Sequence, residues 1–192
     1  FGGSIHGTGN TANTVTDITS LDGGTAAVTV AAIDSNIEDI TITGPTTIKG
    51  NITTASDGVI SITGNTTIFG NITIDTKTGG GANVTIDGTL NANATSDDLD
   101  IDAGTGTIEI TGDIAGTTAF ATIDLNAVAS GSTDGTTVGG VTLGGDIGVT
   151  GTAGAGATNI GNTETTGAIT LSGDMYHTSG ALAIRGGSYA VG

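Results

Sequence analysis

Large apolar residues alternate with polar residues in short runs along most of this chain. In such runs Ile, Val or Leu occupies every second position, with Thr, Asp or Asn between them. A period of two is typical of β-strands with one buried face and one solvated face. Thr and Gly are poor helix formers, and no apolar stripe recurs at helical spacing over three turns. The sequence therefore predicts an all-β protein. The expected strands are residues 28–30, 40–43, 59–63, 68–74, 84–86, 99–101, 108–114, 123–125, 141–149, 169–175 and 182–184.

One segment of the chain copies another. Residues 41–54 read TITGPTTIKGNITT and residues 61–74 read SITGNTTIFGNITI, so ten of fourteen positions are identical at an offset of 20 residues. A fixed period of this length indicates stacked supersecondary units, none of which buries its apolar face alone.

A second motif joins Gly to a polar residue and then to Ile, Leu or Met. Gly within a strand pattern marks a bend or bulge, and a bend repeated in successive units is what the corner of a coil requires. The spacing varies from 18 to 33 residues, which predicts inserted loops near 129–140 and 151–167. The motif occurs at Gly50-Asn51-Ile52, Gly70-Asn71-Ile72, Gly88-Thr89-Leu90, Gly112-Asp113-Ile114, Gly145-Asp146-Ile147 and Gly173-Asp174-Met175.

Two architectures fit these patterns. We favour a β-solenoid, a parallel β-helix, because aromatic residues are only 3% of the chain and Gly is 36 of 192 residues. The alternative is an antiparallel β-sandwich or jelly roll completed by a strand from a neighbouring subunit, but sandwich cores usually contain several large aromatics. Residues 1–24 lack the alternation and are expected to form an N-terminal arm or cap that a neighbouring subunit can exchange. Residues 25–192 are expected to form a single β domain.

The composition narrows the class of partner. The chain has 3 Lys and Arg against 19 Asp and Glu, for a net charge of -16. Such a chain repels phosphate backbones, so we expect no nucleic-acid partner. No apolar run approaches the length of a membrane span, so we expect no insertion into a membrane. Cysteine is absent. Acidity, abundant Thr and Asn, and scarce Lys suit an extracellular or cell-surface protein.

The run LDIDAGTGTIEITGDIAGTTAFATIDLNA at residues 99–127 carries a family resemblance. It resembles the Gly/Thr/Asn-rich repeats of secreted filamentous haemagglutinin-like and related surface β-helix proteins, over residues 40–185. The resemblance implies a right-handed parallel β-helix on a cell surface, used in adhesion or as a fibre. The Thr-rich, Cys-free composition is also similar to that of strand-exchanging prokaryotic pilins.

The densest acidic cluster is a candidate calcium site. On a strand, alternate carboxylates share one face, where they repel one another unless a hard cation with oxygen ligands screens them. A solvated strand face gives the same pattern. The cluster consists of Asp97, Asp98, Asp100 and Asp102.

Five Asn-x-Ser/Thr sequons suggest a glycosylated surface. Their asparagines are Asn51, Asn65, Asn71, Asn83 and Asn93.

Enzymatic chemistry is not expected. Sugar-cleaving β-helices need aromatic platforms beside their carboxylates, and this chain has almost no aromatics. Rows of Thr also suggest an ice- or mineral-surface binder. The simpler interpretation is that Thr forms the ordinary polar face of a strand. The expected function is a structural subunit that polymerises with itself through head-to-tail strand contacts. A monomeric adhesin module that binds a host or neighbouring-cell surface is the alternative.

Overall fold

The computed structural model describes residues 5–6, 18–35, 39–54, 58–76, 80–127, 139–162, 165 and 167–192. Over these residues the chain forms strands, turns and bends, and its named strands pair in parallel. Parallel pairing between successive turns defines a β-solenoid, which confirms the favoured architecture and excludes the antiparallel sandwich. Most of residues 1–17, and most of the loop expected near 129–140, lie outside the described residues.

Three sheets form the faces of the solenoid, and each turn passes through sheet B, then sheet C, then sheet A. Sheet A contains β1 (Ile5–His6), β4 (Ile33–Ser35), β7 (Ile52–Thr54), β10 (Ile72–Asp75), β13 (Asp98–Asp102), β15 (Phe120–Leu125), β17 (Ala155–Ile160) and β19 (Leu182–Ile184). Sheet B contains β2 (Ile18–Asp22), β5 (Ile40–Thr43), β8 (Ile60–Thr63), β11 (Val84–Asp87), β14 (Ile108–Ile110), β16 (Val141–Leu143), β18 (Ala168–Leu171) and β20 (Ser188–Val191). Sheet C contains β3 (Val28–Val30), β6 (Thr46–Ile48), β9 (Thr66–Ile68) and β12 (Leu90–Ala92), and single-residue bridges through Ile114, Ile147 and Tyr176 continue it.

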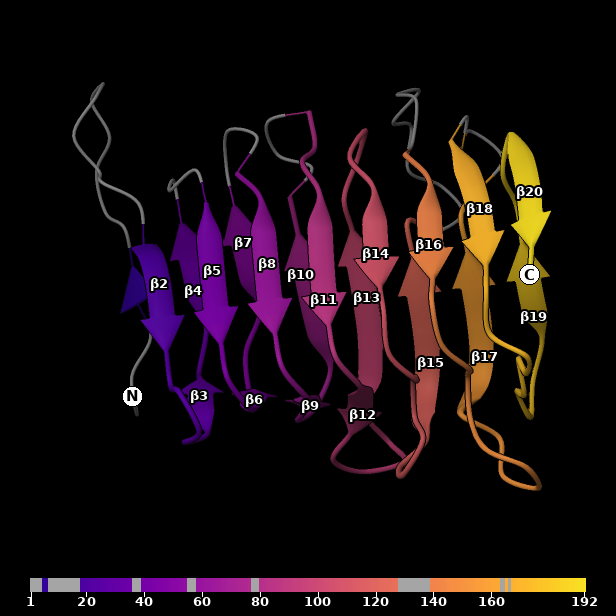
Figure 1. The fold of residues 1–192 in the computed structure, drawn as a ribbon, viewed down its shortest axis with the longest axis horizontal. Helices are drawn as coiled ribbons and strands as arrows, with labels where there is room; N and C mark the ends of the chain where they lie inside the picture. Colours follow the sequence, from indigo (N-terminus) through magenta and orange to yellow (C-terminus); the bar gives the residue numbers. More distant parts are fainter. Residues whose placement is uncertain are drawn as a thin grey trace.

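The solenoid is right-handed. In Figure 1 the strands of sheet B run downward in front, those of sheet A run upward behind, and the chain advances from left to right. This is the hand that parallel crossover connections adopt almost without exception, because of the right-handed twist of strands.

Columns of apolar side chains run through all turns and form the core. In sheet B one column contains Ile42, Ile62 and Ile86 in register, and it continues through Ile110, Leu143 and Leu171. These side chains are buried. Among the described residues Phe120 is the one fully buried aromatic, and Tyr176 packs partly buried against the core. Stacked Ile, Val and Leu therefore supply most of the buried apolar surface.

The copied segments occupy neighbouring turns, as the sequence predicts. On sheets B and C the residues 20 apart pair, for example Ile42 with Ile62 and Thr46 with Thr66. On sheet A the pairing slips by two residues, since Ile52 pairs with Ile74 rather than with Ile72. A slip of two positions keeps the same side chains inside, so the apolar pattern permits it.

Several expected strands are in fact two strands separated by a corner. Residues 68–74 divide into the end of β9 and the start of β10, and residues 108–114, 141–149 and 169–175 each bend between sheets B and C. In residues 108–114 and 141–147 the period of two continues across the bend, since Ile114 and Ile147 are buried with the same parity as the strands before them. In residues 169–175 it does not, because Tyr176 rather than Met175 pairs with Ile147. Val149 lies beyond its corner and is exposed. The loop expected near 151–167 contains β17.

Glycines form a column at the corner between sheets B and C. Gly64 and Gly88 have φ of +124° and +147°. A Cβ at Gly88 would lie 2.6 Å from the carbonyl carbon and oxygen of Gly64, so no side chain fits there. The column consists of Gly44, Gly64, Gly88, Gly112, Gly145 and Gly173.

Buried polar residues hydrogen-bond the backbone at the other corners. The hydroxyls of Thr54 and Thr76 donate to the carbonyls of Gly58 (2.9 Å) and Ala82 (2.7 Å). Asn126 accepts from the N–H of Ala103 (2.7 Å) and donates to the carbonyl of Gly139 (3.3 Å). Such bonds satisfy backbone groups that the turning chain removes from the sheets.

None of the described residues forms a helix long and apolar enough to cross a membrane.

Candidate functional site

The four aspartates of the candidate calcium site lie on or beside β13. Asp98 and Asp100 are on the outer face of sheet A, while the alternate residues Leu99 and Ile101 are buried. Asp97 is buried, and its carboxylate accepts from the N–H groups of Asn93 (3.1 Å) and Ala94 (2.8 Å). It therefore closes the turn before β13.

The remaining members of this cluster also contact protein groups. Asp98 accepts from the Thr122 hydroxyl (2.7 Å), and the buried Asp102 accepts from the N–H of Gly104 (3.2 Å). Within the described residues no three His, Cys, Asp or Glu side chains are placed to hold a metal ion. Calcium binding here stays a prediction from sequence.

The pairing of sheets places further carboxylates beside this cluster. Asp100 is in register with Asp124, and Asp75 is in register with Asp102. Neighbouring parallel strands are about 4.8 Å apart, so each pair brings two acidic groups onto adjacent turns. The Asp124 carboxylate also accepts from the Asn159 side-chain amide (2.6 Å). Sheet A therefore carries acidic residues at neighbouring positions of adjacent turns.

All five sequon asparagines are exposed. Three of them connect consecutive turns through their side-chain oxygens. Asn51, Asn65 and Asn83 accept from the N–H groups of Thr73 (3.0 Å), Thr89 (3.4 Å) and Thr107 (2.9 Å). These asparagines thus have a structural role whether or not they are glycosylated, and glycosylation stays a prediction.

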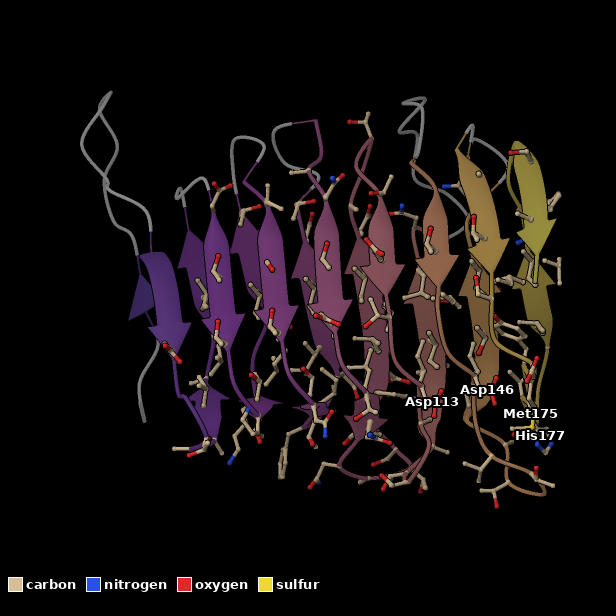
Figure 2. The ribbon with its side chains drawn as sticks, in the orientation of Figure 1. Asp113, Asp146, Met175 and His177 are labelled. Atoms are coloured by element: carbon tan, nitrogen blue, oxygen red, sulfur yellow. The ribbon has the colours of Figure 1, made fainter. Side chains whose placement is uncertain are left out.

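Aspartates make the same kind of link at the corner between sheets B and C. Figure 2 shows Asp113, Asp146 and Met175 side by side at this corner of three successive turns. The Asp113 carboxylate accepts from the N–H of Asp146 (3.0 Å), and the Asp146 carboxylate accepts from those of Asp174 (2.7 Å) and Met175 (3.0 Å). We call Asp113, Asp146 and Asp174 the aspartate column.

Tyr176 packs beside this column. Burial raises the pKa of its phenol above the ordinary value of 10.0, the N–H of Gly173 donates to its oxygen (3.0 Å) and lowers the pKa, and the charge of Asp146 raises it again. The net shift is upward, so the phenol is neutral at physiological pH.

The threonines considered for ice or mineral binding do not form a single array. Thr46 and Thr66 point into the core, where each donates to a corner glycine carbonyl. The others are divided among the outer faces of three sheets. Thr41, Thr43 and Thr63 belong to sheet B, Thr47 and Thr67 to sheet C, and Thr53 and Thr73 to sheet A.

The last turn exposes the apolar columns of the core. Tyr189 and Val191 on β20 are 58% and 75% exposed, and Leu182 on β19 is 38% exposed. Tyr189 continues the column of Ile169, and Val191 continues that of Leu171. We call Leu182, Ile184, Tyr189 and Val191 the terminal apolar surface.

Sequence analysis did not single out this surface. It expected a strand at residues 182–184, whereas the structure has β19 there and a further strand, β20, after it. The signal was present in the alternation Tyr189-Ala190-Val191, which is short and is not bounded by a recognisable turn on its far side.

Comparison with protein-family models, curated proteins and solved structures finds no match to this chain. Its class is therefore defined by the fold itself, a right-handed parallel β-solenoid with three sheets.

Proposed function

We propose that this chain is a structural protein that assembles with copies of itself into a fibre, at a cell surface or in an extracellular matrix. The observation that carries the proposal is the terminal apolar surface. Tyr189, Val191 and Leu182 expose apolar area in the position where every earlier turn of the core is covered by the next turn. Covering this area with another turn of a solenoid removes it from water and stabilises the contact.

The backbone supports the same proposal. Each inner strand of sheets A and B pairs with a strand on both sides, but β19 and β20 pair on one side only among the described residues. An open edge presents unpaired N–H and C=O groups, and such edges are templates for strands of another chain. A contact that joins unlike surfaces and does not close generates a fibre rather than a ring.

The extracellular location rests on composition, namely a net charge of -16 with only 3 basic residues and abundant Thr and Asn. A large net charge keeps individual copies soluble before they assemble.

The test is to replace both Tyr189 and Val191 with Lys. Lysine on an edge strand opposes pairing, because its charge would have to be buried at the contact. We expect the unchanged chain to form regular filaments in electron micrographs and to sediment as large assemblies. The double variant should raise the concentration needed for assembly by about tenfold or more, which corresponds to 1.4 kcal/mol per tenfold change.

The matched control is Val59→Lys, since Val59 is 38% exposed at a corner remote from the last turn. This variant should assemble as the unchanged chain does. Monomers of the unchanged chain at every concentration would overturn the proposal and favour the alternative of a monomeric adhesin module.

A further inference from the structure

The one methionine of the chain lies two residues before one of its two histidines. Met175 and His177 flank Tyr176 at the corner where sheet B passes into sheet C. Neither side chain belongs to the buried core or to the terminal apolar surface. Self-assembly therefore does not account for this pair.

The backbone places both side chains on one face. The N–H of Ile147 donates to the carbonyl of Met175 (2.8 Å), and the N–H of His177 donates to the carbonyl of Ile147 (2.9 Å). This parallel bridge holds residues 175–177 extended, so their side chains alternate between the two faces. Because Tyr176 packs against the core, Met175 and His177 point outward. Both are half-buried, and Figure 2 shows them together at this corner.

The two side chains carry donors that can meet at one ion. Met175 has a polarizable thioether sulfur, and a neutral imidazole such as that of His177 has a lone pair on one ring nitrogen. No described residue hydrogen-bonds the His177 ring. Alternate residues of a strand are about 6.6 Å apart, and the three rotatable bonds of Met let its sulfur approach the ring.

We propose that Met175 and His177 form a binding site for Cu(I). Thioether sulfur selects soft ions, and imidazole is a good ligand for copper. The filled d shell of Cu(I) imposes no preferred geometry, so the ion accepts a low coordination number. Calcium instead takes about six to eight oxygen ligands, so this site differs in class from the one predicted at residues 97–102.

The aspartate column supplies charge and rigidity beside the pair. Since Ile147 pairs with Tyr176, Asp146 lies next to Met175 on the preceding turn, about 4.8 Å away between strands. Its carboxylate accepts from the N–H groups of Asp174 (2.7 Å) and Met175 (3.0 Å) and so fixes the backbone that carries the sulfur. Its negative charge also attracts a cation. The outer face of a corner is open to solvent whether or not a further turn follows.

Competition for Cu(I) with the chromophoric chelator bicinchoninate tests the site, in the absence of oxygen and with ascorbate as the reductant. Carbon-13 in the methionine methyl group reports on Met175 directly, and the signal is assigned by its loss in Met175→Leu. We expect the unchanged chain to withdraw Cu(I) from the chelator and the methyl signal to shift as the ion binds. Met175→Leu and His177→Gln should each weaken binding by about tenfold or more, since even groups outside the ligand set typically contribute about tenfold.

Two further variants are matched controls. The exchange Asp174→Met with Met175→Asp keeps composition and net charge but moves the sulfur by one residue, out of alternation with His177. It should bind Cu(I) about fivefold more weakly or worse, because neighbouring residues of an extended chain point to opposite faces. His6→Gln removes the other histidine, on β1 at the far end of sheet A, and should bind as the unchanged chain does.

Circular dichroism of each variant establishes that the fold is kept. A methyl signal that Cu(I) leaves unchanged would overturn the site, as would equal affinity in the unchanged chain and in both single variants. Displacement of the ion by an equal concentration of calcium would also overturn it, because the carboxylates rather than the soft donors would then hold the cation. These measurements use dilute protein, so their outcome is independent of fibre formation.

Discussion

Glycine at the corner between sheets B and C is required by the distance between turns. Gly64 and Gly88 combine a positive φ with direct backbone contact to the preceding turn. Any residue other than Gly is excluded at these positions. A φ in this range is almost restricted to Gly, and the space that a Cβ would need is already occupied. The corner column is therefore a packing requirement as well as a conformational one.

Replacement of Gly88 by Ala should destabilise the solenoid. The new Cβ would meet the backbone of Gly64 at 2.6 Å, and strain at such a φ typically costs about 1–3 kcal/mol. Chemical denaturation followed by circular dichroism would measure this loss in the free energy of unfolding.

The control for this prediction is Gly116→Ala, where the added Cβ has only an ordinary contact, 3.9 Å from the Asp113 Cβ. Its free energy of unfolding should stay close to that of the unchanged chain. Equal stability of the two variants would contradict the role of the glycine column.

At the scale of elements, the aspartate column ties one turn to the next by charge-assisted hydrogen bonds. Asp146 is the central member, since its carboxylate accepts two backbone N–H groups of the following turn. Each inter-turn contact of this kind stabilises a corner where the chain leaves one sheet and has not yet entered the next.

Asp146→Ala should lower the free energy of unfolding by about 1–3 kcal/mol, because the two N–H groups lose their acceptor. Asp146→Asn should recover most of this loss, since the amide oxygen can accept in the same position. Hydrogen exchange of the Asp174 and Met175 amides is the local measurement. If Ala and Asn leave these amides equally protected, the link contributes nothing.

The sequence predicts the strands better than the sheets to which they belong. The Gly-polar-Ile motif at Gly50 and Gly70 leads into sheet A, whereas the similar motif at Gly112 and Gly145 leads into sheet C. The same motif therefore occurs at two different corners, so its residues alone do not predict which sheet follows. The equivalents of Gly112 in the copied turns are Gly44 and Gly64, where Pro-Thr and Asn-Thr follow instead.

Short strands with inward threonine were missed for a related reason. In β6 and β9 the first inward residue is Thr46 or Thr66, so the apolar alternation that predicts a strand is absent. Their burial becomes favourable only when the corner carbonyl that accepts the hydroxyl is in place. For the acidic cluster, alternation correctly placed Asp98 and Asp100 on one face but gave no sign of the turn-closing bonds of Asp97.

For the whole molecule, charge opposes the assembly that we propose. Copies with a net charge of -16 repel one another when they stack. Salt shortens the range of this repulsion from about 30 Å at 0.01 M to about 8 Å at 0.15 M.

We therefore expect the concentration needed for fibre formation to fall as sodium chloride is raised over this range. Sedimentation at several protein concentrations would measure the change. The Lys variant of Tyr189 and Val191 should remain poorly assembled at every salt concentration. Weaker assembly of the unchanged chain at high salt would indicate that attractive charge pairs, rather than apolar columns, hold the junction.

The nearest-neighbour arrangement of turns also determines how the solenoid responds to tension. Each turn is bonded only to the turn before it and the turn after it. A force that pulls on the two ends of the chain therefore acts on the outermost turn first, and the inner turns carry load only after it detaches. One turn at the centre, residues 64–87, contains 24 residues. Its release adds about 80 Å of extended chain, so the molecule lengthens stepwise, turn by turn, and absorbs mechanical work without breaking a covalent bond.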